Sequence, residues 1–486
     1  MPLTPVPRSR SSGLRTPARL LAAGGAAAAL AASFVASAGL PIPSQQPTLQ
    51  AGPVTFTFGG FTELATIYRN RNESADVGSD FNAGIPYNNN PNSQVSEFRE
   101  SARQSRFSLL VQGEQYQGVQ AEAYMETDFL GAANTANSRE SNSYNLRMRV
   151  FYGRFTTAWG LDVLAGQSWS LATLYTQGLA PRQENVPLTI DAQYVVGFNW
   201  TRNPQVRVVE HFSKKFSLGI SLESPQGVTG NGGISCSGLA PGSSCVPPNV
   251  DFQNLGNPGG LMNATTTYTT DVAPDVIIKA AWDPGFGHYE IYGLSRWFNS
   301  SISRQSSTVA GGGIGAGMIL PLVPNRLSFQ VSGLIGKGIG RYGSGQMPDV
   351  TMRPNGQLSP ISEYEAMLGL IFTPTRALRI YAYAGREKES SNYVVNGSVT
   401  YGYGAPTYNN SGCYATSGPC VANAQSIQEE TLGTWWKYYH GKLGDLQFGL
   451  QGAYLQKDAF AGVGGAPSAN IFIGMASFRY YPYEQF

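Results

Sequence analysis

The chain of 486 residues contains little charge. Asp, Glu, Lys and Arg make up 13% of it, about half of the ~25% typical of soluble domains. Glycine (58), tyrosine (26) and phenylalanine (23) are abundant instead. Because 42% of the residues are hydrophobic and 12% are aromatic, the composition argues against an intrinsically disordered chain. The formal net charge of +2 provides no basic footprint for nucleic acid.

Long hydrophobic runs are missing beyond the N-terminal region. No stretch there reaches the roughly 20 apolar residues of a membrane-spanning helix, which argues against a helical membrane protein. Histidine is rare, and no motif supplies any of the three histidines with a serine and an acidic partner: His211, His288 and His440. HExxH and GxSxG motifs are absent as well. We therefore expect a large polar β protein that is not an enzyme and binds no cofactor or metal.

The first 38 residues have the composition of a secretory signal peptide. An apolar stretch at 20–35 leads into a small-residue cleavage site, Ala36-Ser37-Ala38. It follows a segment without acids that carries four arginines: Arg8, Arg10, Arg15 and Arg19. Cleavage would remove those four charges and change the formal net charge from +2 to −2. A short transmembrane anchor is the alternative. We expect an exported chain with a short periplasmic segment at 39–53 and a folded domain at 54–486.

The chain has only four cysteines, in two close pairs. Cys236 and Cys245 form one pair, Cys413 and Cys420 the other, and both lie in stretches rich in Gly, Ser, Pro and Asn. In an exported chain this pattern predicts two local disulfides that fix loops. A four-ligand metal site is the weaker alternative, because both spacings exceed that of CxxC and no histidine is near.

The rest of the sequence alternates between apolar and polar residues in short runs. In 216–223 every even position is bulky and apolar, and every odd position is small or charged. The runs 119–129 and 146–152 alternate in the same way. Because successive strand side chains point to opposite faces, each run predicts a strand with one apolar and one polar face. The runs are about 9–12 residues long, as a tilted strand needs to cross a bilayer.

Short and long polar gaps alternate along the chain, which is typical of outer-membrane barrels rather than sandwiches. Segment 192–200 resembles a strand but breaks this rhythm, so we place it in the third long loop. The glycine run at 311–315 is assigned to a strand, where small residues permit curvature or close subunit packing. We predict a closed, transmembrane antiparallel β-barrel of about sixteen strands, with short periplasmic turns and long external loops. The expected strands are 54–69, 103–114, 118–129, 144–157, 160–167, 204–212, 216–223, 273–283, 287–298, 308–320, 326–337, 362–373, 376–386, 428–440, 443–456 and 470–486.

Charged residues on the inward phase of these strands are the candidate pore lining. Four arginines alternate with apolar residues: Arg106, Arg147, Arg149 and Arg207. Three acids lie on the strand before the second and third of them: Glu122, Glu126 and Asp128. Neighbouring strands lie ~4.8 Å apart, so these groups can meet and create a field that selects ions. The alternative is that they only pair and stiffen the wall. Three further cations fall on the inward phase of later strands: Arg296, Arg379 and Lys437.

The third long loop, from Gln167 to about Asn203, is the candidate constriction. Connections of this length are usually functional or mobile. An apolar stretch at 171–174 favours folding into the lumen, although packing on a neighbouring subunit is possible. The loop would bring three charged residues to the pore: Arg182, Glu184 and Asp191.

Several segments resemble the DcaP-like family of outer-membrane porins. They are 60–68 (GFTELATIY), 104–107 (QSRF), 145–153 (NLRMRVFYG) and 164–170 (LAGQSWS), and 202–207 and 222–225 extend the match. The resemblance implies a sixteen-stranded homotrimer that takes up small, often anionic, solutes such as dicarboxylates. The N-terminal coiled coil that such proteins often carry is missing, because 39–53 is too short for heptads. The final Phe486 resembles the signal that barrel-assembly machinery reads.

These observations predict a passive porin in the bacterial outer membrane. Its partners would be outer-membrane lipid, small solutes and, during biogenesis, the barrel-assembly machinery. Two other functions stay open. A plugged surface barrel could act in adhesion or envelope structure through its long loops, and an outer-membrane hydrolase could place catalytic side chains on the strands.

Overall fold

A computed structural model describes residues 47–131, 145–239, 243–254, 268–416 and 418–482. The predicted signal peptide and Phe486 lie outside these residues. All described residues belong to the unit Ser44–Phe486. Within them, no helix is long and apolar enough to cross a membrane.

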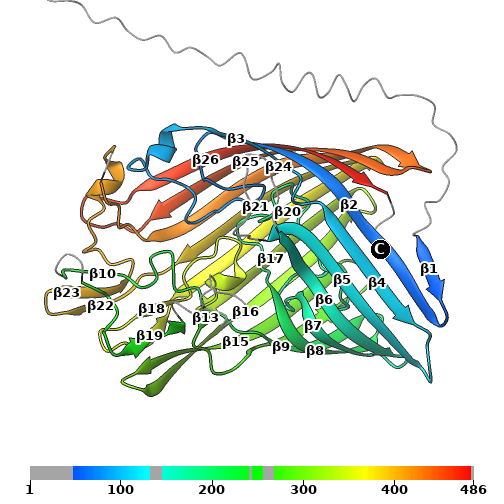
Figure 1. Ribbon diagram of the computed structural model, residues 1–486, viewed down its shortest axis with the longest axis horizontal. Helices are drawn as coiled ribbons and strands as arrows, with labels where there is room; N and C mark the ends of the chain where they lie inside the picture. The colour runs from blue at the N-terminus through cyan, green and yellow to red at the C-terminus, as the bar shows by residue number, and fades with distance from the viewer. Residues whose placement is uncertain (1–46, 132–144, 240–242, 255–267, 417, 483–486) are drawn as a thin grey trace, which may run out of the picture. The chain divides into compact units, whose positions relative to one another are not determined.

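Sixteen antiparallel strands close into a barrel, as predicted (Figure 1). The strands are β2 (Val54–Arg69), β4 (Arg106–Gly113), β5 (Val119–Gly131), β6 (Asn145–Thr157), β7 (Leu161–Trp169), β8 (Arg202–Ser213), β9 (Phe216–Glu223), β14 (Asp275–Trp282), β15 (His288–Ile302), β16 (Gln305–Val323), β17 (Leu327–Lys337), β20 (Ser362–Thr375), β21 (Leu378–Glu389), β24 (Ala424–Gly441), β25 (Gly444–Ala459) and β26 (Ser468–Tyr481). The last strand closes the cylinder by pairing with the first, from Thr62↔Tyr480 to Arg69↔Ile473. Closure leaves no unpaired strand edge.

The strand expected at 103–114 begins at Arg106, as β4, and a further strand that was not predicted precedes it. β3 (Glu97–Ser101) pairs with residues 65–69 of β2, and β4 pairs with residues 54–61. Residues 102–105 form a turn between β3 and β4. The Ser105 hydroxyl accepts the N–H of Glu63 at 2.9 Å, and so replaces the missing ladder bond. Gly60 permits the close approach, because at its φ of 126° a Cβ would collide with the carbonyl oxygen of Arg106. The alternation continues through this turn, so it gave no sign of the break.

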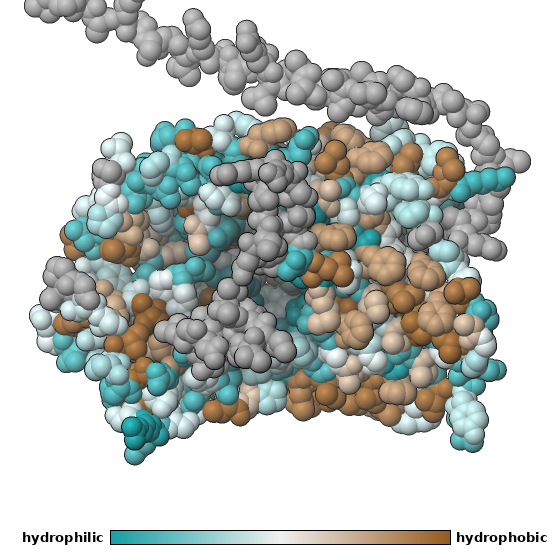
Figure 2. Space-filling view, in the orientation of Figure 1, coloured by the Kyte–Doolittle hydropathy of each residue, from teal (hydrophilic) through white to brown (hydrophobic). Residues whose placement is uncertain are grey.

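The outer wall is apolar and the inner wall is polar. On β9, Leu218, Ile220 and Leu222 are 41–46% exposed, whereas Ser221 and Glu223 are fully buried. Figure 2 shows hydrophobic side chains gathered over β4 to β6 on the outer surface. A soluble protein has the opposite arrangement, with apolar side chains inside and polar ones outside. The outer wall is therefore suited to apolar surroundings.

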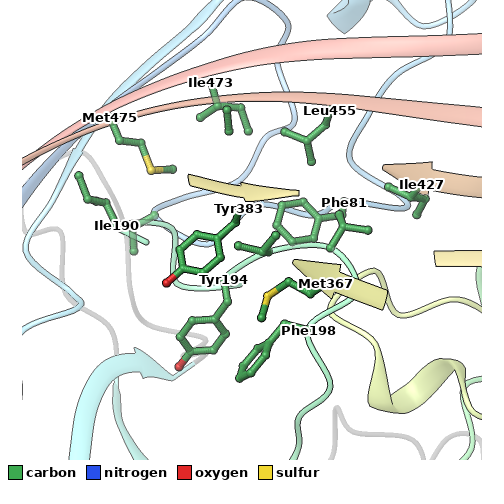
Figure 3. Packing of buried hydrophobic residues seen from close by; sticks show 14 of the residues in the cluster. Phe81, Ile190, Tyr194, Phe198, Met367, Tyr383, Ile427, Leu455, Ile473 and Met475 are labelled. Atoms are coloured by element: carbon green, nitrogen blue, oxygen red, sulfur yellow. The ribbon is translucent and has the colours of Figure 1, made fainter. Parts of the chain in front are cut away.

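An apolar core lies inside the barrel. The first long loop (70–96) and the third (170–201) fold into the lumen, where the Ala192 N–H donates to the Val77 carbonyl at 3.0 Å. Phe81 and Phe198, one from each loop, are at most 1% exposed. Figure 3 shows these loop residues packed against inward-facing strand side chains, among them Met367, Tyr383, Ile427, Leu455, Ile473 and Met475. The inward third loop is confirmed, and the inward first loop was not predicted.

Smaller strands join the long loops at one end of the barrel, called here the long-loop end. β10 (Cys236–Ser237) pairs with β23 (Val399–Tyr403), which pairs with β22 (Asn392–Asn396). The two predicted disulfides, Cys236–Cys245 and Cys413–Cys420, are both formed. The other small elements are β1 (Thr48–Ala51), β11 (Val250–Asp251), β12 (Gln253–Asn254), β13 (Tyr268–Thr269), β18 (Val350–Met352), β19 (Leu358–Pro360) and 3-10 turns at Pro91–Gln94, Gly340–Tyr342 and Ser411–Tyr414.

Candidate functional site

The third loop is held across the lumen by carboxylates of the barrel wall. Its Leu171 N–H donates to Glu223 at 2.9 Å near the start of the loop. Near the end, the N–H of Gly197 donates to Glu387 at 2.7 Å. The N–H groups of Tyr175 and Val196 donate to Glu290 and Glu429 in the same way. Because these carboxylates belong to strands on different sides of the cylinder, the loop narrows the lumen.

Arg207 and Asp191 hold this loop instead of facing open water. The Arg207 guanidinium is 1% exposed and donates to the Tyr175 hydroxyl at 2.6 Å and to the Trp169 carbonyl. Asp191 is 3% exposed and accepts the N–H of Ser79 at 3.1 Å, which ties the third loop to the first. Both residues were predicted to line the pore, but the inward folding of two loops covers them.

Four of the predicted charges meet on β5 and β6. Arg149 binds Glu126 at 2.5 Å and Asp128 at 3.0 Å, and it also donates to the hydroxyl of Tyr194. Arg147 binds Asp128 at 2.7 Å. The pairing between neighbouring strands that the sequence predicted is therefore present. Arg149 and Asp128 are buried, whereas the Arg147 side chain is 35% exposed.

Glu122 stands at the centre of a second charged group. It binds Arg154 at 3.0 Å and Arg182 of the third loop at 3.5 Å. Arg154 in turn binds Asp162 at 2.6 Å. Arg182 has a left-handed backbone, with φ of 69°, and its guanidinium stacks over the Tyr124 ring. A non-glycine residue rarely adopts this conformation, so its surroundings must fix it there.

A cavity of about 230 Å³ opens between the third loop and β4 to β7. Arg106 reaches into it, 3.7 Å from Glu126 and stacked on the Phe61 ring at 5.2 Å. The other charged residues of its lining are Glu126, Arg149, Arg182 and Glu184. Its lining also contains two tyrosines and two serines: Tyr124, Tyr152, Ser108 and Ser168. We call this cavity the constriction.

A second cavity, of about 440 Å³, adjoins the constriction and shares Arg106 and Val186 with it. Its lining includes the turn between β20 and β21, so it lies toward the short-turn end; we call it the vestibule. Besides Arg106, its cations are Arg376, Arg379, Lys437 and Arg479, and its acid is Asp445. The alternation placed Arg379 and Lys437 on the inward phase, and the same signal could have found Arg479. The short turn gave no such signal for Arg376.

Some cations of the vestibule bind an acidic side chain and others do not. Lys437 binds Asp445 at 2.7 Å, and Arg479 binds Glu63 at 3.1 Å while it stacks on Trp435. Within the described residues, no acid lies within salt-bridge distance of Arg376 or Arg379, and both are exposed. These two charges are available to a solute.

Burial alters the pKa of three side chains of the third loop. It raises the pKa of Glu184, although the Arg207 guanidinium acts in the opposite direction. Burial likewise raises the pKa of Asp191 above its usual range. Burial alone would also raise the pKa of Tyr194, but the Arg149 guanidinium and its neighbours outweigh this effect and lower it.

All three histidines have polar partners that the sequence did not reveal. His440 Nδ1 lies 2.5 Å from Asp445. His211 Nδ1 lies 2.8 Å from Ser217 Oγ, and its Nε2 lies 3.9 Å from Asp162. The His211 side chain is 27% exposed, but Ser217 is only 3% exposed and Asp162 is already bound by Arg154. His288 lies between Asp283 and Glu290. Among the described residues, no group of three His, Cys, Asp or Glu is placed to hold a metal ion.

Removing a carboxylate that anchors the third loop should loosen the constriction. Glu387 is fully buried and accepts the N–H groups of Gly197 and Gly345. Its replacement by alanine orphans both donors at a cost of about 2 kcal/mol or more. We expect Glu387→Ala to lower the thermal unfolding temperature and to increase the noise of the open-channel current. Glu430→Ala on the outer wall is the control, and equal stability and noise in the two variants would contradict this role.

The fold is similar to that of known outer-membrane proteins. The outer membrane channel DcaP of Acinetobacter baumannii superimposes with a TM-score of 0.60 at 15% identity, over 90% of this chain and 100% of that chain. OmpT of Vibrio cholerae matches with a TM-score of 0.46 at 9% identity, over 89% of this chain and 99% of that one. An anion-selective porin from Comamonas acidovorans matches with a TM-score of 0.46 at 10% identity, over 88% and 99%.

No protein-family model and no curated protein sequence matches the chain. The similarity to DcaP covers 90% of this chain. Because the two sequences are only 15% identical, this similarity is evidence for the fold alone. The resemblance to DcaP-like porins that the N-terminal segments predicted is confirmed in that respect. The chain therefore has the sixteen-stranded barrel fold of an outer-membrane porin.

Proposed function

We propose that the protein is a passive channel for small anionic solutes in the bacterial outer membrane. The observation that carries this proposal is the unpaired charge of the vestibule. Its lining has five cations and one acid, and Arg376 and Arg379 have no acidic partner among the described residues. Cations that line a narrow water-filled path attract anions and repel cations.

The constriction supports the same selectivity more weakly. Its lining carries Arg106, Arg149 and Arg182 against Glu126 and Glu184. A small solute with one or two carboxylates would meet a positive potential through both cavities. Dicarboxylates, which the family resemblance implies, belong to this class.

The cellular setting is part of the proposal. We propose that residues 1–38 direct export and are removed, and that the short-turn end faces the periplasm while the long loops face outside. The homotrimer and assembly by the barrel-assembly machinery rest on the resemblance. The apolar outer wall supports contact with membrane lipid.

Reconstitution of the mature protein into a planar bilayer tests the proposal directly. We expect stepwise single-channel currents. In a salt gradient, the sign of the reversal potential should show that anions permeate more readily than cations. Liposome swelling should be faster with dicarboxylates than with cationic solutes of the same size. A folded protein that produces no current would refute the channel, and a current selective for cations would refute only the anion preference.

A plugged surface barrel is the second candidate, and one observation favours it. Two loops fill part of the lumen with an apolar core, a small sheet joins the long loops, and two disulfides fix these loops. Such a protein would insert into bilayers without conducting. Loss of surface adhesion on deletion of 224–249 in a non-conducting barrel would support it. A hydrolase would have to show lipid or peptide cleavage that His211→Ala abolishes.

A further inference from the structure

A shallow furrow crosses the outer wall over β16, β17 and β20. It forms because three small residues stand side by side, with Ala316 paired to Gly333 and Gly333 paired to Ala366. Larger residues border it on one side through Ile314, Ile335 and Tyr364, and on the other through Met318, Val331 and Leu368. The furrow has a volume of about 720 Å³ and an almost entirely apolar lining. It faces outward, because Ile314 and Ile335 are 63% and 64% exposed.

Cations stand at the end of this furrow. The row of small residues ends at Ala366, and the next residue across the sheet is Arg386 of β21, which pairs with Ala366. Lys388 pairs with Tyr364 in the adjacent row, and Lys337 on β17 pairs with Ser362. Their register places all three on the outward phase near the long-loop end of the strands. Neighbouring strands lie ~4.8 Å apart, so Arg386 stands roughly 14 Å from Ala316, one strand beyond the lining of the furrow.

These three cations lack acidic partners among the described residues. Arg386 donates to the Ser426 hydroxyl at 3.4 Å, and neither Lys337 nor Lys388 forms a salt bridge there. The nearest outward acid by register is Glu430, which pairs with Ala384 one row below Arg386. Below the cations the wall is apolar, with Leu368 and Leu370 44–48% exposed. The cations therefore mark the upper limit of the apolar wall, where lipid headgroups lie.

We propose that this surface binds a phosphorylated glycolipid of the outer leaflet, of the lipid A type. One acyl chain lies in the furrow over Ala316, Gly333 and Ala366. Phosphate groups at its end are held by Arg386, Lys388 and Lys337. The proposal rests on the barrel lying in the outer membrane, but it does not depend on conduction. We favour a lipid over a second copy of the chain as the occupant of this surface, because three cations without acidic partners need an anionic partner.

Native mass spectrometry of the intact protein in nanodiscs tests this site. The probe is bisphosphorylated lipid A in a phosphatidylcholine background. We expect Lys337→Gln with Arg386→Gln and Lys388→Gln to weaken retention of lipid A about tenfold or more, since each surface cation contributes ~1 kcal/mol to anionic-lipid binding. Lys214→Gln with Lys215→Gln and Lys442→Gln removes the same charge at the short turns and should retain lipid A.

A second variant tests the furrow without changing any charge. Ala316→Leu with Ala366→Leu fills it and should also weaken retention, while single-channel conductance stays unchanged in both variants. Equal retention in the cation variant and its control would overturn the proposal, even if the furrow variant failed to insert. Equal binding of dephosphorylated lipid A would overturn the role of phosphate. Dissociation of an oligomer by the furrow variant, without loss of lipid, would assign the furrow to a second copy.

Discussion

Replacing Arg376 and Arg379 by glutamate should reverse the proposed anion preference and make the channel cation-selective. Both side chains are exposed in the vestibule and have no acidic partner among the described residues. The double substitution changes the local charge from +2 to −2 without breaking a salt bridge. A difference of ~1.4 kcal/mol in the interaction with a permeating ion already alters its occupancy tenfold. We therefore expect the reversal potential in a salt gradient to change sign.

A matched control separates the local effect from net charge. Lys214→Glu with Lys215→Glu makes the same change on the turn between β8 and β9, outside the vestibule lining. This control should keep the anion preference of the parent. If both double variants shifted the reversal potential equally, selectivity would follow the whole-protein charge and the vestibule would have no special role. The difference in reversal potential between the vestibule variant and this control should become smaller at high salt, because salt screens exposed charges.

Removing Arg149 should destabilise the barrel more than removing Glu387 does. Its guanidinium is 2% exposed and binds Glu126 and Asp128, and it also donates to Tyr194 of the third loop. Arg149→Met leaves two acids short of their counter-ion, and breaking a buried ion pair in this way costs about 3–5 kcal/mol. Arg147 still binds Asp128, which favours the lower end of this range. We expect a lower unfolding temperature in detergent.

The same substitution should also change permeation, because it removes a cation from the constriction and frees the hydroxyl of Tyr194. Arg149→Lys keeps the charge but cannot reproduce the pattern of donors, so its stability should be intermediate. Arg147→Glu removes the more exposed arginine and places an acid beside Asp128. It should move selectivity toward cations with a smaller loss of stability. If the Arg149→Met variant unfolded at the same temperature as the parent protein, this result would contradict the role assigned to Arg149.

The sequence alone determined the barrel, because a strand has a period of two and the two faces of a barrel wall meet different solvents. The alternation by itself assigns Leu218, Ile220 and Leu222 to one face. The pairing of Glu126 and Asp128 with Arg149 also followed, because adjacent strands joined by one loop lie beside each other. The cysteine pairs were predictable for a similar reason, since each pair is close in the sequence.

The tertiary structure decided which inward side chains face water. Arg207 has the same alternating pattern as Arg147, whose side chain is 35% exposed, yet the third loop covers Arg207. No local sequence pattern predicts a loop that folds back into the lumen. Phe81 belongs to a polar loop whose composition predicts exposure, but it completes an apolar core with residues distant in the sequence. Arg376 lies on a short turn and becomes important because β21, β24 and β26 bring other cations beside it. Short-range alternation fixes the face of a residue, whereas burial and charge balance depend on the contacts that the closed cylinder creates.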